Sequence, residues 1–278
     1  MQLLDSRKLA LQIRQDLKQK IAGFKIKPGL AIILVGKDQA SHTYVRLKAQ
    51  AAQEIGMHFE RFVFPENTSQ ADIINRIRAL NQNPQIHGVL VQLPLPRPLS
   101  ADQIISAIGP KKDADGFQFE SLKNFRSDPN VLAPALCQGV WRLIQSADQN
   151  LNLAKAAILA NSTAFGEPMS IMLARQGLDV IPLYPPFQNF QTLTKAAKVV
   201  VIAIGQANFL KAEHLAPGVI VIDVGFNRVD GKVVGDVDSA SVKNLPGWLT
   251  PVPGGVGPMT VAMLMQRVLA LYEKNAKL

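Results

Sequence analysis

A tyrosine and a lysine stand four residues apart in the stretch SHTYVRLK, at Tyr44 and Lys48. On a helix this spacing places both side chains on one face, within reach of the same small molecule. The two residues are therefore candidates for a catalytic pair. The same spacing also occurs on ordinary solvated helix faces, so the pair alone leaves both interpretations open.

Two further polar residues stand where a strand and a turn would leave them near a ligand. Gln92 ends an apolar strand just before LPLP, and ligands of open parallel sheets bind beyond the carboxyl ends of strands. Asp115 precedes Gly116 in KKDADG, a pattern that equally suits a solvated turn. Gln92 alone also fits a polar residue that caps a turn, so neither position is decisive.

The densest signal is TPVPGGVGPMT, from Thr250 to Thr260. Gly254 and Gly255 allow the backbone to approach a ligand closely and to adopt positive φ angles. Pro258 suits the first turn of a following helix, whose free N–H groups favour an anion or a polar ring edge. A tight loop-to-helix turn without a ligand is the plainer alternative.

These residues lie in an alternation of amphipathic helices and short apolar strands. In the first half the pattern predicts helices at 5–20, 73–80, 101–108 and around Tyr44 up to Ile55, and strands at 30–36, 58–64 and 87–96. In the second half it predicts strands at 156–160, 179–184, 198–205 and 219–225. The expected fold is α/β, with two doubly wound lobes, the second a Rossmann-type dinucleotide-binding domain.

Proline, glycine and charged residues dominate 109–118 and 127–139, so the domain boundary is expected near Pro134. Residues 1–133 then form a first domain and 134–257 a second. An apolar helix from about Pro258 to Tyr272 must pack somewhere. We expect it to return to the first domain, which assigns 258–278 there and leaves a cleft between the lobes.

The second domain lacks the usual glycine-rich fingerprint G-x-G-x-x-G. Its first loop, ANSTAFGEPM at 160–169, has one glycine, Gly166, before Pro168 and a helix. That loop can still present a helix N-terminus to a pyrophosphate. The next strand should end on an acid for a ribose hydroxyl or a base for a 2′-phosphate, but LYPPFQ at 183–188 offers neither.

Composition indicates a soluble cytoplasmic protein with a real core. The apolar fraction is 47%, the mean hydropathy is +0.10, and no apolar run is long enough to span a bilayer. The single cysteine, Cys137, excludes a disulfide framework and a cysteine-rich metal site, and we expect no metal. The net charge of +9 is scattered, which argues against nucleic acid and suits small polyanions.

Taken together, the segments VGKDQASHTYVRLK, GVLVQLPLP, KDADGF, GQANFL, PGVIVIDVGFNRVDGKVVGDVD and TPVPGGVGPMTVAMLM resemble the bifunctional methylenetetrahydrofolate dehydrogenase/methenyltetrahydrofolate cyclohydrolase (FolD) family. They follow the family's order over nearly the whole chain. The resemblance implies a folate-binding catalytic first domain, NADP on the Rossmann domain, with NAD possible, and a homodimer. The implied activity is NADP-dependent hydride transfer followed by cyclohydrolase ring opening, which interconverts methylene-, methenyl- and formyl-tetrahydrofolate for purine biosynthesis.

The resemblance also assigns residues. It makes Lys48 the proton-transfer agent of the cyclohydrolase, aimed by Gln92, with Tyr44 packing on the substrate ring and Asp115 accepting bonds from the pterin. Other substrate-binding residues are Leu93, Gly254, Gly255 and Pro258. The implied cofactor-binding residues are Asn161, Ser162, Gly166, Pro168, Gly205, Asp223, Gly225 and Gly255.

Departures from the family pattern cluster on the cofactor side. The arginine, histidine and serine that usually hold the 2′-phosphate are absent at Asn161 and across LYPPF, and the lobe junction reads PALCQG. Lys195 and Lys198 follow and could supply a cation. The alternative function is therefore a cyclohydrolase-only enzyme or a folate-binding paralogue with weakened or lost NADP binding.

Overall fold

The computed structural model describes residues 1–275, which divide into two compact units. The N-terminal unit comprises Leu11–Ala135 and the chain from Val261 onward, and the C-terminal unit comprises Met1–Ala10 and Leu136–Thr260. Each unit has its own parallel sheet. The last helix, α10 (Val256–Asn275), contributes most of its length to the N-terminal unit. None of the helices in this described part is long and apolar enough to cross a membrane.

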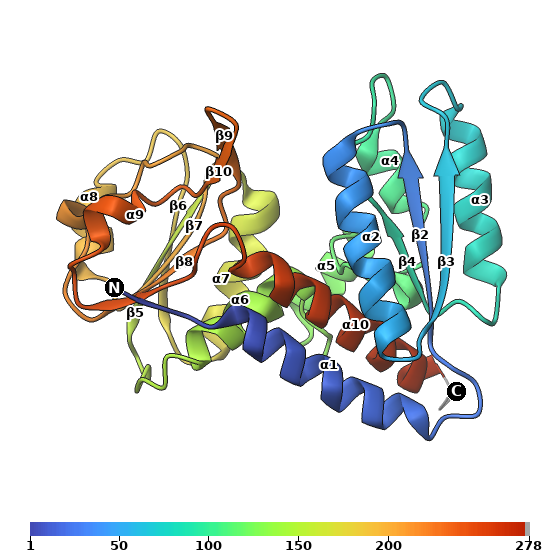
Figure 1. Cartoon of the computed structure of the whole chain (residues 1–278), viewed down its shortest axis with the longest axis horizontal. Coiled ribbons are helices and arrows are strands. Elements are labelled where there is room, and N and C mark those ends of the chain that lie inside the picture. Colours follow the sequence, from blue (N-terminus) through green and yellow to red (C-terminus); the bar gives the residue numbers. More distant parts are fainter. Residues whose placement is uncertain (276–278) are drawn as a thin grey trace. The chain divides into compact units, whose positions relative to one another are not determined.

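The N-terminal unit is built on three parallel strands in the order β3-β2-β4 (Figure 1). They are β2 (Gly29–Val35), β3 (His58–Phe64) and β4 (Gly88–Val91). A bridge from Val89 to Asp113 extends the sheet beyond β4. Because β2 lies in the middle and is covered on both faces, all seven of its residues are buried. This explains its unbroken apolar sequence.

Helices cover the two faces of this sheet. Alternate residues of β2, Ala31 and Ile33 among them, join one apolar cluster with α3 (Gln70–Gln82) and α4 (Ala101–Ser106). The intervening residues point the other way, and α2 (Gln39–Glu54) packs on β2 and β3. The other helical elements of this unit are η1 (Pro110–Lys112), α5 (Phe119–Ser127) and most of α1 (Ser6–Ala22), which begins in the C-terminal unit. Helix α6 (Ala135–Gln145) belongs to the C-terminal unit from Leu136 onward.

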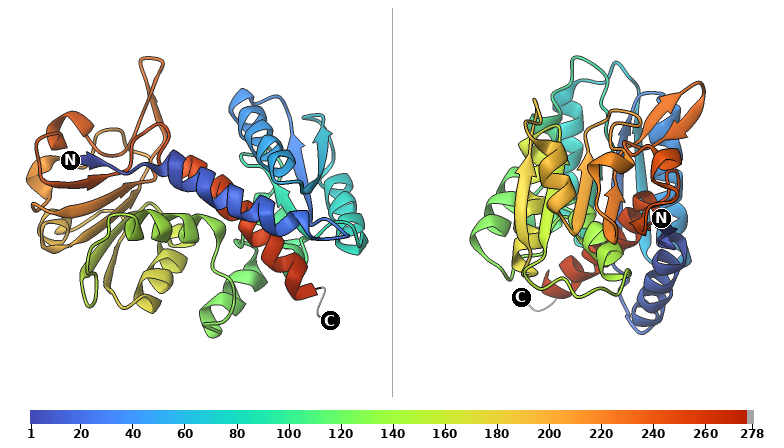
Figure 2. Two further views of the ribbon diagram at one scale, coloured as in Figure 1. Left: turned by 60° about the horizontal axis from the view of Figure 1, so that its bottom comes forward. Right: turned by 90° about the vertical axis from the view of Figure 1, so that its left-hand side faces the viewer.

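The C-terminal unit is a six-stranded parallel sheet in the order β1-β11-β8-β7-β5-β6. Its strands are β1 (Gln2–Leu3), β5 (Lys155–Ala160), β6 (Asp179–Leu183), β7 (Val199–Ala203), β8 (Val219–Asp223) and β11 (Gly247–Leu249). The order reverses between β5 and β7, as in other dinucleotide-binding sheets. A hairpin of β9 (Asn227–Val229) and β10 (Lys232–Val234), orange in Figure 2, projects from the unit.

The first ten residues lie in a different unit from the one expected. The sequence suggested that 1–133 stay together, but Gln2 pairs with Trp248 and Leu3 with Leu249. The N-terminal stretch thus adds an edge strand to the C-terminal sheet before α1 leads into the N-terminal unit. A two-residue strand leaves no periodic signal, which is why the sequence did not reveal it.

Two helix starts also differ from expectation. Helix α7 (Thr163–Arg175) begins directly after Ser162, so Gly166 and Pro168 lie inside the helix rather than in the loop before it. Helix α10 begins at Val256, two residues before the expected start at Pro258. Pro258 still falls in the first turn, where its missing N–H costs nothing.

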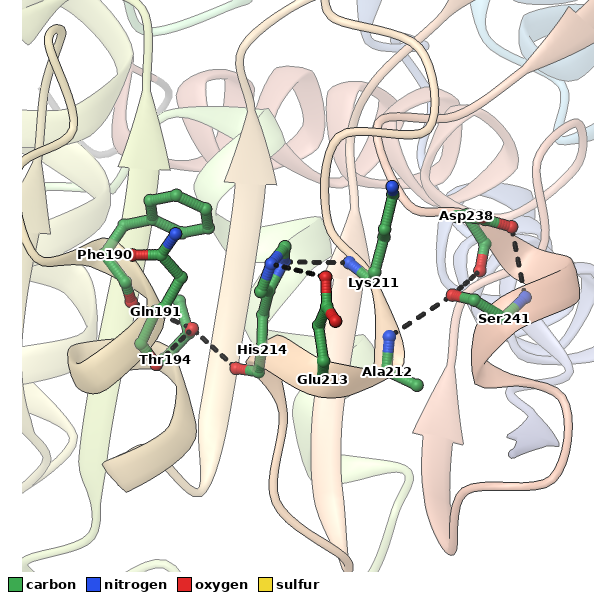
Figure 3. Close-up of polar contacts among 9 residues, drawn as sticks. All are labelled: Phe190, Gln191, Thr194, Lys211, Ala212, Glu213, His214, Asp238 and Ser241. Carbon is green, nitrogen blue, oxygen red and sulfur yellow. Dashed lines mark hydrogen bonds and ion pairs between the residues drawn. The ribbon is translucent and has the colours of Figure 1, made fainter.

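Side-chain bonds fasten the connection between β7 and β8 on both sides (Figure 3). The Thr194 hydroxyl of α8 (Phe190–Ala196) donates to the His214 carbonyl over 2.6 Å. His214 ends η2 (Ala212–His214), and its Nδ1 accepts from the Lys211 amide. On the other side the Ala212 amide donates to Ser241 in α9 (Ser239–Val242). These contacts fix a scaffold region and involve none of the expected ligand-binding residues.

Candidate active site

The topology of the N-terminal unit brings two expected site residues together. Its strand order reverses between β2 and β4, and ligands of such sheets bind at the carboxyl ends of the strands beside that reversal. Helix α2 starts just after β2, capped by the Asp38 carboxylate, which accepts from the Ser41 amide over 2.7 Å. Gln92 directly follows β4, and its amide donates to the Ile33 carbonyl. The helix carrying Tyr44 and Lys48 therefore lies beside the strand end carrying Gln92.

Lys48 and Gln92 form a direct hydrogen bond. The Lys48 Nζ donates to Gln92 Oε1 over 2.9 Å. The other end of the same amide, Nε2, donates to the Leu93 carbonyl over 2.7 Å. Because the carbonyl of Leu93 can only accept, it fixes which way the Gln92 amide faces. Gln92 therefore presents its oxygen to the lysine and orients it.

Burial and charge set the protonation of this centre. Burial lowers the pKa of Lys48, while the nearby Asp115 carboxylate acts in the opposite direction. Burial raises the pKa of Asp115, and Asp113 adds to that rise, whereas the cations Lys48 and Arg267 oppose it. Lowering the pKa of a lysine increases the fraction of the neutral amine, which is the form that can accept a proton. Lys48 and Asp115 thus influence each other's charge, and Gln92 is hydrogen-bonded to the lysine.

The turn that carries Asp115 is built by its neighbour Asp113. The buried Asp113 carboxylate accepts from the Gly116 amide over 2.9 Å and from the Gln118 amide over 3.0 Å. Its carboxylate is therefore committed to the fold. Within the described residues no protein group donates a hydrogen bond to the side chain of Asp115, which is half-buried and remains available as an acceptor. The structure thus separates the two aspartates of KKDADG by role.

The two remaining expected residues of this unit are Tyr44, on the same helix as the lysine, and Leu93, next to Gln92. Tyr44 is half-buried on α2, one helical turn before Lys48, and shares its face. Leu93 is 44% exposed, and its carbonyl accepts from the Ser41 hydroxyl over 3.4 Å. An exposed leucine beside the Lys48–Gln92 pair is suited to apolar contact with a ring.

The C-terminal unit has a second candidate site, where its strand order reverses between β5 and β7. Asn161 and Ser162 follow β5 and are exposed, and Asn161 donates its amide to the Ala203 carbonyl at the end of β7. Helix α7 begins immediately afterwards, and its N-cap, Ser162, makes no side-chain capping bond. The first amides of a helix in this position can bind a phosphate.

The next expected positions are packed rather than open. Gly166 is buried, and a Cβ there would lie 2.6 Å from the Tyr184 hydroxyl, so the tyrosine at the end of β6 requires a glycine beneath it. Pro168 is buried in α7. Phe187 of LYPPF is 8% exposed and belongs to the unit's apolar core. Gly166 and Pro168 are thus buried in the packing beneath the site and are not open to a ligand.

Lysines that follow in sequence lie toward the opposite end of the sheet. Lys198 precedes β7, and a Cβ added to Gly218, just before β8, would lie 3.5 Å from its Nζ. Both positions are at the amino ends of these strands. Lys195 lies in the last turn of α8, the helix that leads back to that end. Neither lysine is placed to hold a phosphate at the carboxyl ends.

The loop after β7 is held by a residue that the sequence did not single out. The carboxylate of buried Asp236 accepts from three successive amides, those of Ile204, Gly205 and Gln206, over 2.7, 3.1 and 2.9 Å. Gly205 itself is exposed, has a φ of +67° and has open space where a Cβ would be. Asn227 donates to the same carboxylate over 2.9 Å. Asp236 thus fixes the backbone of this loop.

Asp223 and Gly225 both contact Asp236, the residue that holds that loop. The Asp223 carboxylate, 3% exposed, accepts from the amides of Gly225, Asp236 and Val237 over 2.9, 3.0 and 3.0 Å. A Cβ on Gly225 would collide with the Asp236 carboxylate. Burial raises the pKa of Asp223 to about 6, while its backbone bonds to Val237, Asp236 and Gly225 oppose that rise. Its carboxylate is occupied by the chain itself.

The glycine-rich segment before α10 forms a tight turn in the C-terminal unit. Gly254 has a φ of +102°, and a Cβ there would lie 3.1 Å from the Arg7 guanidinium. A Cβ on Gly255 would lie 2.4 Å from the Pro251 carbonyl oxygen, so only glycine fits. Pro258 is half-buried in the first helical turn. The turn therefore needs its glycines for packing, whatever else they do.

Sequence reasoning missed Asp113, Asp236 and Arg267. The first two are adjacent to recognised motifs, in KKDADG and GDVD, and their buried setting alone distinguishes them. Arg267 lies in the middle of the apolar stripe of α10, and a buried arginine there must find carbonyl or carboxylate partners. That interruption was the one signal available.

Comparison with known proteins matches both halves of the chain. Residues 4–115 match the tetrahydrofolate dehydrogenase/cyclohydrolase catalytic domain, and residues 134–276 match the NAD(P)-binding domain of the same family. The bifunctional protein FolD of Cupriavidus necator is 40% identical over 99% of both chains. The protein of the same name from Ruthia magnifica is 40% identical over 98% of this chain and 99% of its own.

Solved structures agree over the full length. FolD from Campylobacter jejuni is 36% identical, with a TM-score of 0.94 over 99% of both chains. The Trypanosoma brucei enzyme, solved with NADP cofactor and an inhibitor, is 29% identical, with a TM-score of 0.92 over 99% of this chain and 98% of its own. These matches span both units and both sites. The chain therefore belongs to the tetrahydrofolate dehydrogenase/cyclohydrolase family.

Proposed function

We propose that this protein interconverts methylene-, methenyl- and formyl-tetrahydrofolate, first by NADP-dependent hydride transfer and then by hydrolytic ring opening. The observation that carries the proposal is the Lys48–Gln92 bond next to Asp115, within the matched catalytic domain. The chain would then act as both an oxidoreductase and a hydrolase in one-carbon metabolism. Family membership supports the two-activity function over a cyclohydrolase alone.

The N-terminal unit would hold the folate. Asp115 offers a carboxylate to the amino and ring N–H groups of the pterin, and such charge-assisted bonds are strong. Tyr44 and Leu93 offer accessible apolar surface near the Lys48–Gln92 pair. The hydride leaves a carbon held between two nitrogens, so this step requires orientation rather than an acid or base. The protein's task in that step is to hold the substrate still.

Lys48 would carry the protons of the second step. Water adds to the methenyl carbon, and one carbon–nitrogen bond then breaks to open the ring. A neutral Lys48 can accept a proton from the attacking water and return it to the departing nitrogen, while the hydroxyl proton of the water adduct leaves to solvent as the formyl carbonyl forms. The lowered pKa of Lys48 favours the neutral form, and the bond to Gln92 aims the Nζ lone pair. The protein returns to its starting protonation state, and one proton is released to solvent because the methenyl substrate is a cation and the formyl product is not.

NADP would bind at the strand-order reversal of the C-terminal unit and, when bound, accept the hydride. The donor set fits a dinucleotide: α7 presents an N-terminus without a side-chain cap, with exposed Asn161, Ser162 and Gly205 beside it. We propose that these three contact the cofactor directly. Gly166, Pro168, Asp223, Gly225 and Gly255 would instead act by shaping the backbone, because all five are buried.

We further propose that Gly254, Gly255 and Pro258 place the start of α10 against a ligand ring, and that the protein is a cytoplasmic homodimer assembled through its C-terminal unit and serving purine biosynthesis. The dimer proposal follows from family resemblance and apolar content. Sedimentation at micromolar concentration should give twice the chain mass of 30.3 kDa. A species of 30.3 kDa under those conditions would reject it.

The two activities can be tested separately with the purified protein. Reduction of NADP in the presence of methylene-tetrahydrofolate reports the dehydrogenase, and loss of methenyl-tetrahydrofolate absorbance reports the cyclohydrolase. We expect both activities in the wild-type protein. Hydrolysis without NADP reduction would favour the cyclohydrolase-only alternative, and absence of both would leave a folate-binding paralogue.

A further inference from the structure

We propose that Arg267 is a positioning residue for the folate site: its hydrogen bonds to backbone carbonyls hold the turn that carries Asp115 in place. The inference rests on the proposed function, because it assumes that Asp115 binds the substrate. It concerns the N-terminal unit alone, since α10 from Val261 onward, the Asp115 turn and the segment up to Ala135 all belong there.

The guanidinium of Arg267 bonds to two separate stretches of backbone. Its Nε donates to the Asp113 carbonyl over 3.0 Å. Its Nη1 donates to the carbonyls of Leu132 and Ala133 over 2.9 and 2.8 Å. The residue is 3% exposed, so these bonds are shielded from water. A planar fork of this kind can join three carbonyls at once, which an ammonium cannot do with the same geometry.

Both stretches that Arg267 joins also meet at Asp115. The Ala135 amide donates to the Asp115 carbonyl over 3.0 Å, and the Ala114 amide donates to Val89 in β4 over 3.2 Å. At Gly116, which has a φ of +84°, a Cβ would lie 2.9 Å from the Arg267 guanidinium carbon. The turn therefore packs directly on the arginine, and the backbone of Asp115 is tied on both sides.

Charge gives Arg267 a second effect that plain packing would not have. Asp115 feels the cations Lys48 and Arg267 and the anion Asp113, all within the same unit. Arg267 favours the ionised form of Asp115, which is the form that accepts bonds from a pterin. Removing this cation should raise the pKa of Asp115. As the pH is lowered, folate binding should therefore begin to weaken at a higher pH than in the wild type.

The test compares Arg267→Gln, Arg267→Lys and Asp115→Asn in the full-length protein. For each variant, KM for methylene-tetrahydrofolate is measured from pH 5 to 9, and Kd for NADP is measured by calorimetry. Lys274→Gln is the matched control, because it removes an exposed cation seven residues along the same helix. It should leave both quantities unchanged.

We expect Arg267→Gln to raise the folate KM at neutral pH at least tenfold and to leave Kd for NADP within twofold of the wild type. The acidic limb of its pH profile, which is the rise in folate KM as the pH falls, should move to higher pH. Arg267→Lys should keep the acidic limb in place but still raise KM. If Arg267→Gln does not fold, the lysine variant carries the test through its KM alone. Asp115→Asn should abolish the acidic limb.

The outcomes separate the inference from the proposed function. If Asp115→Asn weakens folate binding while the Arg267 variants keep a wild-type KM and acidic limb, the positioning role is wrong and the proposed function stands. If Asp115→Asn leaves folate KM unchanged, the folate site itself is wrong. A parallel loss of NADP affinity in Arg267→Gln would show general unfolding rather than positioning and would also overturn the inference.

Discussion

Replacing Lys48 by methionine tests the centre of the proposed mechanism. Methionine keeps the length and apolar stem of the lysine but cannot carry a proton. The Nζ that it removes is the group bonded to Gln92 Oε1 over 2.9 Å. Since Gln92 is half-buried, water can replace the lost donor, and the amide stays anchored to the Leu93 carbonyl. The geometry of the site should therefore survive the change.

The expected loss follows from the role assigned to the lysine. General acid–base catalysis contributes roughly 10²- to 10⁴-fold to a rate, so the cyclohydrolase kcat should fall by about that factor. The dehydrogenase step uses no proton transfer from Lys48. Its rate should therefore fall far less, through weaker substrate positioning alone. The ratio of the two activities is the quantity that the mechanism predicts.

Stability should change in the opposite sense from activity. Burial lowers the pKa of Lys48 in the folded state below its value in the unfolded state. The contribution of Lys48 to the free energy of unfolding is therefore favourable above the unfolded-state pKa and is lost as the pH falls through the folded-state pKa. Near neutral pH the buried lysine therefore costs stability. Lys48→Met should unfold at the same temperature as the wild type or a higher one.

Absorbance assays of both activities and a thermal melt check these expectations together. Arg46→Met, an exposed position on the same helix, is the control for the loss of a cation from α2 and should leave both activities intact. Cyclohydrolase activity within tenfold of the wild type in Lys48→Met would refute the role of the lysine. Equal loss of both activities with a lowered melting temperature would indicate structural damage instead.

Three other predictions can be checked with the same protein. Gln92→Glu places a carboxylate beside Lys48, which should raise the pKa of the lysine and move the cyclohydrolase pH profile to higher pH; an unmoved profile would count against the pair. Kd values for NADP and NAD should lie within about tenfold of each other, because Asn161 lacks the charge of an arginine and a charge-assisted bond contributes roughly 1.5–3 kcal/mol; a hundredfold preference for NADP would show that other groups replace it. Burial raises the pKa of Asp223 from 3.8 to about 6, so its contribution to the free energy of unfolding is present below pH 4 and is lost as the pH rises through 6, by up to about 3 kcal/mol. Denaturant titrations of Asp223→Asn should lack this pH-dependent loss of stability. The same pH dependence in the variant and the wild type would contradict the prediction.

The proximity of Tyr44, Lys48 and Gln92, the residues expected to bind folate, was predictable because its signals are local. Helical spacing placed Tyr44 and Lys48 on one face, and the end of an apolar strand placed Gln92 beside them. The choice between the two aspartates of KKDADG came from the family pattern. Only the structure shows the reason, since both carboxylate oxygens of Asp113 accept hydrogen bonds from amides of the turn.

The cofactor side was less predictable because its residues act through distant partners. Phe187 reads in sequence as a position without a donor, while in the fold it fills the core. Asp223 reads as a ligand at a strand end, yet its carboxylate binds amides from the chain near Gly235. The short strands β1 and β11 carry no periodicity, so their pairing across nearly the whole chain could not be inferred.

The late arrival of Arg267 and β11 matters for how the protein is made. The ribosome releases the β2–β3–β4 sheet early, but Arg267 follows its partner Asp113 by 154 residues. At about 5–20 residues per second, the Asp115 turn waits roughly 8–30 s for its clamp. β1 waits longer still, until β11 emerges. Each unit is thus completed by a segment from the opposite end of the sequence, and a nascent polypeptide that stops before Val261 would leave the N-terminal unit unfinished.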